Sequence, residues 1–441
     1  MLFSSLEFIF LFLPLSVGIY FALPQRLRNA WLLISGLCFY GFGEPKFLPL
    51  MLLTILADFL FGVWIGSLGG NKKRARAVLI LAVVYNIGQL AFFKYFDFLG
   101  IGLPIGISFY TFQALSYVID VYRREVAATK SIVAFGAYVS LFPQLIAGPI
   151  VRYTDIEREL YEREHRLSDI ASGMRTFCAG LAKKVLLANV AGQMWESLAP
   201  SGYFADTCLG IFFFSMQIYF DFSGYSDMAI GLGRVFGFNF PKNFDYPYIS
   251  GSITDFWRRW HITLSSWFRE YVYIPLGGNR GGQLKTYRNL LITWALTGIW
   301  HGATLNFLLW GLYFALILIL EKAFLKRILD RAPKILSHLY ALTFIAIGWV
   351  IFAFDGSIEG FNPFLWGANG LASGIFSYEL LRNLPFMAIM TVGATPLPRK
   401  LYLKMRERTA LLDIILPLLA FVLSIAYIVS SGYDPFLYFR F

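Results

Sequence analysis

Residues 78–93 read VLILAVVYNIGQLAFF, and this stretch decides the class of fold. Its apolar side chains follow one another without the alternation of polar and apolar residues that a strand of a membrane β-barrel requires. Residues 211–220, IFFFSMQIYF, show the same continuous pattern. In lipid, such a run satisfies its backbone hydrogen bonds within itself only as a helix. The pattern therefore predicts membrane-spanning helices.

The composition of the whole chain agrees with this prediction. Hydrophobic residues make up 57% of the 441 residues, and charged residues only 15%. A soluble protein carries about a quarter charged residues, because its surface faces water. At about 20 residues per helix plus loops, the chain has room for on the order of ten crossings. We therefore predict an all-α polytopic membrane protein.

Possible spans are distributed along the whole chain. They lie at residues 7–23, 30–45, 48–68, 78–97, 105–121, 132–150, 174–195, 207–234, 288–301, 303–320, 336–354, 383–397 and 411–431. Several contain Gly or Pro, so we expect some to be re-entrant or interfacial, with residues 100–106 (GIGLPIG) as one candidate. The sequence shows no internal repeat and no low-complexity linker, so we expect one membrane domain over residues 1–441.

Basic residues outnumber acidic ones and give a formal net charge of +11. They gather at the ends of apolar runs, for example at Arg26 and Arg28, at residues 72–76 and at residues 399–408. The positive-inside rule assigns such loops to the cytoplasm, which places both termini of the chain outside. Membrane lipids are therefore expected partners. Nucleic-acid binding is not expected, because no loop is long enough to form a docking module.

Two of the four histidines lie in strongly apolar stretches within the polar-rich region at about residues 217–310. His261 ends the run Trp257–His261 (WRRWH), and His301 lies in the run Gly298–Gly302 (GIWHG). An ionisable side chain at membrane depth is costly unless it faces a cavity or a partner, so it indicates a functional site. Imidazole is also suited to transferring protons near neutral pH. The simpler alternative, a hydrogen-bonded core histidine, stays open for each.

The depth of His301 follows from its distance to the preceding cationic loop. From Asn289 to His301 the chain covers about 18 Å of helix, at about 1.5 Å per residue. The hydrocarbon core is about 30 Å thick, so we expect His301 to be recessed within the membrane. We expect Trp300, His301 and Gly302 to end the helix. Gly302 would let another backbone or a substrate approach closely.

Residues 255–271 alternate bulky aromatic side chains with charged ones and predict an interfacial amphipathic helix. Helical spacing would place Trp257 and His261 on one face. The guanidinium groups of Arg258 and Arg259 would then meet phosphates or carboxylates. Anchoring to lipid headgroups alone is the alternative interpretation.

Residues 221–227, DFSGYSD, close an otherwise apolar stretch. Their two carboxylates should be paired or hydrogen-bonded at that depth. A helix break with Asp and Ser caps is the simpler interpretation. Tyr225 and Asp227 are candidate substrate or donor contacts, as are Trp300 and Asn306.

Other chemistries fit the sequence poorly. Cys38, Cys178 and Cys208 show no metal-ligand spacing and are expected to be inert thiols. We find no glycine-rich phosphate loop and no Gly-x-Ser-x-Gly motif, so no bound metal or cofactor is expected. His165 is expected to be a surface residue on a helix rich in ion pairs, and His338 an interfacial one.

Motifs that run almost from end to end carry a family resemblance. They are Phe3–Phe8, Gly106–Gln113, Gln144–Ile150, Asp221–Asp227, Asp255–Ser265, Tyr273–Arg280, Trp300–Gly302 and Pro435–Phe441. The chain resembles the membrane-bound O-acyltransferases, and within them the bacterial alginate O-acetyltransferase-like branch. One departure is Phe314, where such proteins often carry a further histidine.

The resemblance implies a bundle of about 11 transmembrane helices, with re-entrant or interfacial helices, around a central funnel or pore in a bacterial inner membrane. It implies that His301 is the catalytic residue and His261 a supporting one. It also implies acetyl-CoA or another acyl thioester as donor substrate, a polysaccharide acceptor such as alginate or peptidoglycan, and an exported transferase as partner protein.

We therefore expect acetyl transfer across the membrane, with His301 as general base on an acceptor hydroxyl. The alternative function is a transporter that moves a glycan or lipid-linked intermediate intact, without acyl chemistry. That alternative is less favoured, because no repeated pair of broken spans occurs in the sequence. A non-catalytic membrane scaffold is a third possibility.

Overall fold

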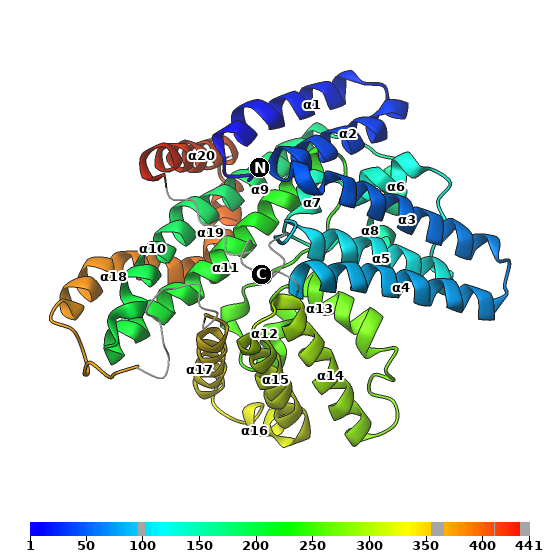
Figure 1. The fold of residues 1–441 in the computed structure, drawn as a ribbon. Coiled ribbons are helices and arrows are strands. Elements are labelled where there is room, and N and C mark those ends of the chain that lie inside the picture. Colours follow the sequence, from blue (N-terminus) through cyan, green and yellow to red (C-terminus); the bar gives the residue numbers. More distant parts are fainter. Residues whose placement is uncertain (96–101, 354–365, 410, 433–441) are drawn as a thin grey trace. The chain divides into compact units, whose positions relative to one another are not determined.

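The structure is a computed structural model that describes residues 1–95, 102–353, 366–409 and 411–432 (Figure 1). Over these ranges the chain folds into helices joined by turns and irregular segments, without a β-strand. The all-α prediction is therefore confirmed. The predicted re-entrant segment at 100–106 and the motif at 435–441 lie partly or wholly outside the described residues.

The helices group into two compact units. Unit 1 comprises Met1–Cys178 and Tyr225–Pro241, and unit 2 comprises Ala179–Gly224 and Lys242–Phe441. Helices α9 (Leu167–Ala182) and α11 (Phe204–Val235) contribute residues to both units. The expectation of a single domain over the whole chain stays a prediction.

Unit 1 is built around three long helices that lie side by side, because α3, α4 and α5 all pack against one another (Figure 1). Besides its parts of α9 and α11, its helices are α1 (Leu13–Ala22), α2 (Gln25–Gly43), α3 (Leu48–Ser67), α4 (Lys72–Tyr95), α5 (Ile107–Arg123), α6 (Ile132–Val139), α7 (Phe142–Leu145) and α8 (Tyr153–Tyr161). A buried polar pair joins α3 to α4, where Nδ2 of Asn86 donates to Oδ1 of Asp58 at 2.7 Å. Polar side chains within spans are expected to pair in this way.

The predicted span at residues 132–150 is wrong. The only helices there are α6 (Ile132–Val139) and α7 (Phe142–Leu145), and most of the stretch is buried. Eight residues make about 12 Å of helix at about 1.5 Å per residue, well short of the hydrocarbon thickness. Pro143 lies in the first turn of α7, and Gly148 adopts φ +119° three residues after this helix ends, so the chain turns instead of crossing.

In unit 2, helices α14 and α15 form a tightly packed hairpin, and α15 also packs against α17. Besides its parts of α9 and α11, the helices of this unit are α10 (Asn189–Leu198), α12 (Ile253–Arg259), α13 (Ile262–Phe268), α14 (Gln283–His301), α15 (Leu305–Leu320), α16 (Lys326–Leu329), α17 (Lys334–Ala353), α18 (Phe376–Gly393), α19 (Leu397–Arg406) and α20 (Leu412–Ser431). The short helix α12 contacts both α15 and α17.

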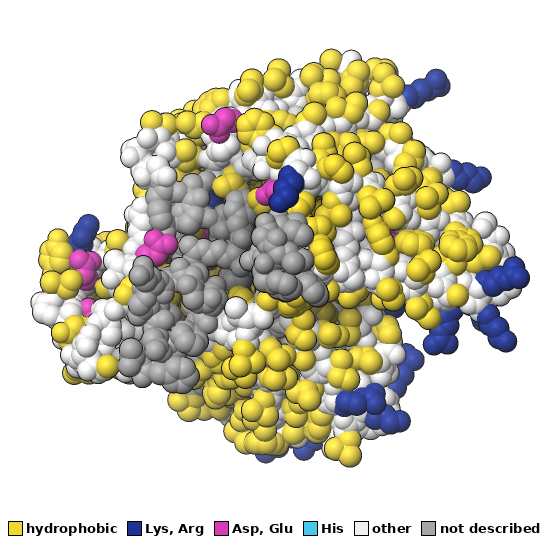
Figure 2. Space-filling view, viewed as in Figure 1, with side chains coloured by type: hydrophobic (Ala, Val, Ile, Leu, Met, Phe, Trp, Pro, Cys, Tyr) yellow, Lys and Arg dark blue, Asp and Glu magenta, His cyan; other side chains and the backbone are white. Residues whose placement is uncertain are grey.

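Within the described ranges, five helical segments are long and apolar enough to cross a membrane. They are Pro45–Ser67, Lys72–Tyr95, Leu305–Leu329, Lys334–Ala353 and Leu412–Ser431. Figure 2 shows hydrophobic side chains over α3 and α4, with Lys and Arg side chains at one end of these helices. This is the distribution expected for helices whose sides face lipid and whose ends face water. The number of about 11 spans stays a prediction.

Residues 221–227 lie inside α11, so the predicted helix break is wrong. This helix continues over 32 residues. The expected charge pairing is confirmed for Asp221, whose Oδ1 lies 2.9 Å from Nζ of the equally buried Lys184. Gly224 permits α11 to pack closely against α9, because a Cβ atom there would lie 2.7 Å from the carbonyl oxygen of Gly180. The carboxylate therefore needs no helix end to satisfy it.

Candidate active site

His301 is positioned by glycines where α14 meets α15. A Cβ atom on Gly298 would lie 2.3 Å from the carbonyl oxygen of Phe307, and one on Gly311 would lie 2.3 Å from that of Trp294. No side chain fits at these contacts. In lipid, helices associate mainly through such close packing, because the apolar surroundings provide little hydrophobic driving force. The glycines thus fix the backbone of the hairpin that carries His301.

His301 is the last residue of α14, and the helix ends there as predicted. Gly302 is extended, and a Cβ atom on it would lie 2.3 Å from the ring of Phe307, which confirms the close approach expected at this glycine. The imidazole is 6% exposed. Its ring centroid lies 4.9 Å from that of Trp310 and 5.4 Å from that of Phe352, both edge-on. His301 is therefore held in an aromatic cage at a helix terminus.

Asn306 braces this cage. Its side-chain Nδ2 donates to the carbonyl oxygens of Ile351 and Phe352, both at 3.3 Å, at the end of α17. Its Oδ1 accepts a hydrogen bond from the hydroxyl of Thr304. These bonds tie the start of α15 to the segment that carries Phe352. The structure thus gives Asn306 a positioning role, whereas its predicted contact with substrate is untested.

The predicted continuous helix over residues 255–271 is wrong, because the chain breaks at Trp260 and His261. Helix α12 ends at Arg259, Trp260 is extended, and His261 adopts φ +41° as N-cap of α13. Trp257 and His261 therefore do not share a helix face. A left-handed backbone is uncommon for residues other than Gly, although Asn, Asp and His adopt it more often than the rest, and such conformations cluster at functional sites.

The break is stabilised by Asn243, in the irregular stretch before α12. Its Oδ1 lies 3.0 Å from Nδ1 of His261 and 2.9 Å from the hydroxyl of Thr263, and it also accepts from the backbone N–H of Thr263 at 3.3 Å. Because that N–H can only donate, the atom facing His261 is an oxygen, and Nδ1 of His261 must be the donor. In the neutral ring this leaves Nε2 without a proton.

The surroundings of His261 favour this neutral form. The side chain is 1% exposed, and its ring lies edge-on to that of Phe222 at 4.6 Å. His261 lies between α12 and α13, outside the candidate spans. Burial lowers the pKa of His261 to about 3, because the charged imidazolium is poorly solvated among apolar groups. At neutral pH, His261 is therefore an uncharged ring.

Trp257 belongs to the aromatic cluster around His301. Its ring lies 4.6 Å from that of Trp294, 5.0 Å from that of Phe314 and 5.5 Å from that of Trp310, which in turn contacts His301. Phe314 is fully buried in this packing. Phe314, named above as a departure from the family pattern, thus supports Trp257 by aromatic packing.

A second series of ring contacts leads from His261 toward the same cage. Phe244 lies 6.5 Å from His261 and 5.1 Å from Trp260. Trp260 lies 4.8 Å from Trp349, which lies 5.9 Å from Phe352 beside His301. Such edge-on and offset contacts each add about 0.5–1.5 kcal/mol beyond area burial. The structure therefore brings both predicted histidines into one continuous aromatic core of unit 2.

The structure separates the two arginines that the sequence grouped together. Arg259 is bound within the fold, with its Nε 3.0 Å from Oδ1 of Asp255 and its Nη1 3.3 Å from the carbonyl oxygen of Asp245. Arg258 is exposed and lines a cavity of about 550 Å³ together with Lys326 and Lys334. Of the two arginines, only Arg258 therefore stays a candidate for binding a ligand's phosphates.

Glu321 supports this site although no sequence motif indicated it. Its carboxylate is 1% exposed and accepts from the backbone N–H groups of Ile253 at 2.7 Å and Thr254 at 2.8 Å, and from the hydroxyl of Tyr340 at 3.1 Å. It therefore caps the N-terminus of α12 from the end of α15. The only signal in the sequence was a lone acid ending an apolar run.

The remaining predicted residues belong to none of the clusters described above. Tyr225 and Asp227 belong to unit 1, where the ring of Tyr225 stacks on Phe3 at 4.6 Å. His165 is half-buried against Tyr20, with Nε2 2.9 Å from its hydroxyl, so the expectation of an ordinary surface residue is wrong. His338 is half-buried and its Nδ1 donates to the carbonyl oxygen of Ser250 at 3.2 Å. A contact of Tyr225 or Asp227 with a substrate stays a prediction.

Comparison with known proteins identifies the family. The sequence profile of the membrane-bound O-acyltransferase family (MBOAT) matches residues 123–357, a range that includes both His261 and His301. The chain is 43% identical to the probable alginate O-acetylase AlgI of Azotobacter vinelandii, over 80% of this chain and 75% of that protein.

Two further relatives extend this similarity. The chain is 37% identical to the probable alginate O-acetylase AlgI of Pseudomonas putida over 100% of both proteins. It is 36% identical to the peptidoglycan O-acetyltransferase of Helicobacter pylori, over 80% of this chain and 77% of that protein. The resemblance stated from the sequence is confirmed, and the protein is a multi-pass membrane O-acyltransferase that belongs to the membrane-bound O-acyltransferase family.

Proposed function

We propose that the protein transfers an acetyl group from acetyl-CoA on the cytoplasmic side to a hydroxyl group of an exported polysaccharide, with His301 as the general base. The observation that carries the proposal is the placement of His301, a buried imidazole at a helix end inside the aromatic core of an acyltransferase. An ionisable group in such a setting is retained at a cost in stability, which favours a chemical role.

In the proposed reaction, His301 accepts the proton of the acceptor hydroxyl while the hydroxyl oxygen attacks the carbonyl carbon of the thioester. The carbon–sulfur bond then breaks, and His301 returns the proton to the departing thiolate, giving the acetyl ester and free CoA. General-base assistance of this kind contributes about 10²–10⁴ in rate. The positive charge that forms on His301 lies at the C-terminus of α14, where the helix dipole stabilises a cation.

The tautomer of His261 limits which supporting role it can have. Because its Nδ1 donates to Asn243, the neutral ring offers only a lone pair at Nε2. It therefore cannot donate a hydrogen bond to an oxyanion without first becoming charged, and its low pKa opposes that. We assign His261 as a hydrogen-bond acceptor that orients a hydroxyl group of the substrate.

The phosphates of the donor are assigned to the cavity lined by Arg258, Lys326 and Lys334. Two carboxylates also line it, Asp330, which pairs with Lys326, and Asp255, which pairs with Arg259. Its volume of about 550 Å³ is within the usual range of ligand pockets, about 300–1,000 Å³. Guanidinium and ammonium groups are the side chains that most often bind phosphate. Helix α12 connects this cavity to the aromatic core, because Trp257 and Arg258 are consecutive residues on it.

The acceptor is inferred from the relatives, whose names specify alginate and peptidoglycan. Both are polysaccharides with free hydroxyl groups outside the cytoplasm. An exported partner transferase, the inner membrane and the outward orientation of both termini stay predictions from the sequence. The transporter interpretation is set aside, because the family is one of acyltransferases.

A radiolabelled acetyl donor tests the proposed acetyl transfer. Acetyl-CoA carrying a ¹⁴C-acetyl group would be supplied to inside-out membrane vesicles that contain the protein and an exported glycan fraction. We expect alkali-labile label on the glycan in the vesicle lumen. Label that stays on CoA, while intact glycan crosses the membrane, would overturn the acyl-transfer assignment in favour of transport.

A further inference from the structure

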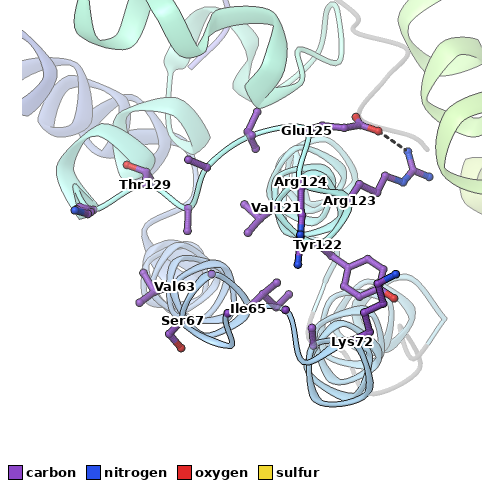
Figure 3. Close-up of a pocket in the computed structure, with 18 residues that line it drawn as sticks. Val63, Ile65, Ser67, Lys72, Val121, Tyr122, Arg123, Arg124, Glu125 and Thr129 are labelled. Carbon is purple, nitrogen blue, oxygen red and sulfur yellow. Dashed lines mark ion pairs between the residues drawn. The ribbon is translucent and has the colours of Figure 1, made fainter.

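A second cavity lies in unit 1 and is distant in sequence from both candidate histidines. It has a volume of about 1070 Å³ and is formed by the end of α3, the turn into α4, and the chain that follows α5 (Figure 3). Four basic side chains and one acidic one line it, namely Lys72, Arg123, Arg124, Lys130 and Glu125. The side chains that line the cavity therefore carry a net positive charge.

The backbone geometry directs one of these cations into the cavity. Arg124 caps the C-terminus of α5 with φ +65°, a left-handed conformation that turns the chain sharply. A Cβ atom on Gly70 would lie 3.3 Å from a guanidinium nitrogen of Arg124. In Figure 3, Arg124 extends toward the segments that carry Ile65 and Lys72, whereas Arg123 points to Glu125. Arg124 is thus held at the opening between α3 and α4.

Only one of the lining cations is neutralised by the lining acid. Nη1 of Arg123 lies 3.8 Å from Oε1 of Glu125. Among the described residues, Lys72 and Arg124 have no carboxylate within 4.0 Å, and both are exposed. Two cationic groups therefore face a solvent-accessible cavity with their charge uncompensated.

The position of the cavity relative to the spans identifies the kind of ligand. Candidate span Pro45–Ser67 ends beside it, and candidate span Lys72–Tyr95 begins beside it, so the cavity lies at the level where hydrocarbon gives way to water. Apolar residues complete its lining, such as Val63 on α3 and Val121 near the end of α5. A ligand that matches both parts of this lining carries a phosphate beside an apolar chain.

We propose that this cavity binds the phosphate headgroup of an anionic phospholipid, with Arg124 and Lys72 as its phosphate contacts. Basic pockets between helices on the cation-rich side of a membrane are suited to anionic headgroups. Each basic residue near an anionic lipid surface contributes about 1 kcal/mol, so loss of two predicts an affinity about 10- to 30-fold lower. The site is independent of the acyl-transfer reaction proposed above.

The experiment compares two charge-matched double variants of the full-length protein in a neutral detergent. Lys72→Gln/Arg124→Gln removes two cations from the cavity. Lys73→Gln/Arg74→Gln removes two cations from the same turn of α4 that do not line it. Native mass spectrometry would measure binding of dioleoyl phosphatidylglycerol, with dioleoyl phosphatidylcholine and inorganic phosphate as further probes.

We expect the wild type and the Lys73/Arg74 variant to bind phosphatidylglycerol alike, and the Lys72/Arg124 variant to bind it at least about 10-fold more weakly. Equal weakening in both double variants would overturn the site, because general surface charge would then account for binding. Displacement of the lipid by low millimolar inorganic phosphate would overturn the lipid assignment in favour of a soluble phosphate ligand.

A third variant covers the case in which Lys72→Gln/Arg124→Gln does not fold. Ala127→Glu adds a carboxylate to the lining at an exposed position and removes none of its cations. We expect it to weaken phosphatidylglycerol binding while leaving phosphatidylcholine binding unchanged. Unchanged phosphatidylglycerol binding in a folded Ala127→Glu protein would contradict the proposal.

Discussion

Nδ1 of His261 lies 3.0 Å from Oδ1 of Asn243, an oxygen that also accepts from Thr263 on the next helix. This single amide therefore sets both the tautomer of a buried histidine and the backbone turn that presents it. Hydrogen bonds of this kind decide which ring nitrogen of a histidine is available for chemistry.

Asn243→Asp should make transfer sensitive to pH. The new carboxylate would favour the charged imidazolium and raise the pKa of His261 from its present value of about 3. Because the assigned role needs the neutral ring, the rate should fall as the pH drops through the raised pKa. In the wild type, the low pKa of His261 keeps the ring neutral near pH 7, so its titration should not lower the transfer rate there. Rate profiles between about pH 5 and 8 measure this, and identical profiles would contradict the assigned tautomer.

His261→Asn tests the side chain without disturbing the turn. Asn adopts the left-handed conformation that His261 has at φ +41°, whereas most other residues are strained there. We expect a folded protein whose transfer rate is reduced about 10²-fold, the size of loss that misplacing a substrate by about 1 Å can cause. Equal thermal stability of the two proteins is the control. A variant with wild-type kinetics would show that His261 serves packing alone.

Arg258→Gln and Arg259→Gln should have different effects. Arg258 lines the cavity assigned to the donor's phosphates, so its loss should raise KM for acetyl-CoA about 10-fold and leave the melting temperature unchanged. Arg259 is bonded to Asp255 and Asp245, so its loss should instead lower the melting temperature. Steady-state kinetics and thermal unfolding of both variants separate the two roles. An unchanged KM in Arg258→Gln would remove the donor-phosphate site.

Glu321→Gln should loosen α12. An amide oxygen can accept one of the two backbone N–H groups, at Ile253 or Thr254, but loses the charge that strengthens both bonds. Hydrogen bonds to charged groups contribute about 1.5–3 kcal/mol, so a clear loss of stability is expected. Glu407→Gln, at an exposed carboxylate on the end of α19, is the matched control. Equal melting temperatures for the two variants would contradict the capping role.

Gly298→Ala should disrupt the hairpin that carries His301. The added methyl group would lie 2.3 Å from the carbonyl oxygen of Phe307, so α14 and α15 must separate. Gly88→Ala is the control, since a Cβ atom there meets nothing within 4 Å. We expect Gly88→Ala to be neutral or slightly stabilising, because Ala favours helix over Gly by about 1 kcal/mol. Acetyl transfer and detergent stability would be measured for both, and a fully active Gly298→Ala protein would count against the packing argument.

The helices could be predicted where lipid alone dictates them. Continuous apolar runs have few alternatives to a helix in a membrane, so α3, α17 and α20 begin and end within a few residues of the predicted spans. The end of α14 at His301 could also be predicted, because the following glycine is a local signal. Local sequence was sufficient for these elements.

The supporting contacts could not be predicted, because they join residues distant in the sequence. The break at His261 depends on Asn243, 18 residues earlier, and the cap of α12 depends on Glu321, 68 residues after Ile253. Helical periodicity over residues 255–271 therefore favoured one continuous helix where tertiary hydrogen bonds impose two. The positions of both candidate histidines could be identified from the sequence, but not the groups that hold them.

The most direct test of the central claim is the rate of acetyl transfer by purified, reconstituted His301→Ala. We expect a protein that folds and inserts with wild-type thermal stability within a few degrees, yet transfers acetyl groups at least about 10²-fold more slowly. Transfer at the wild-type rate by this variant would contradict the role of His301 as general base.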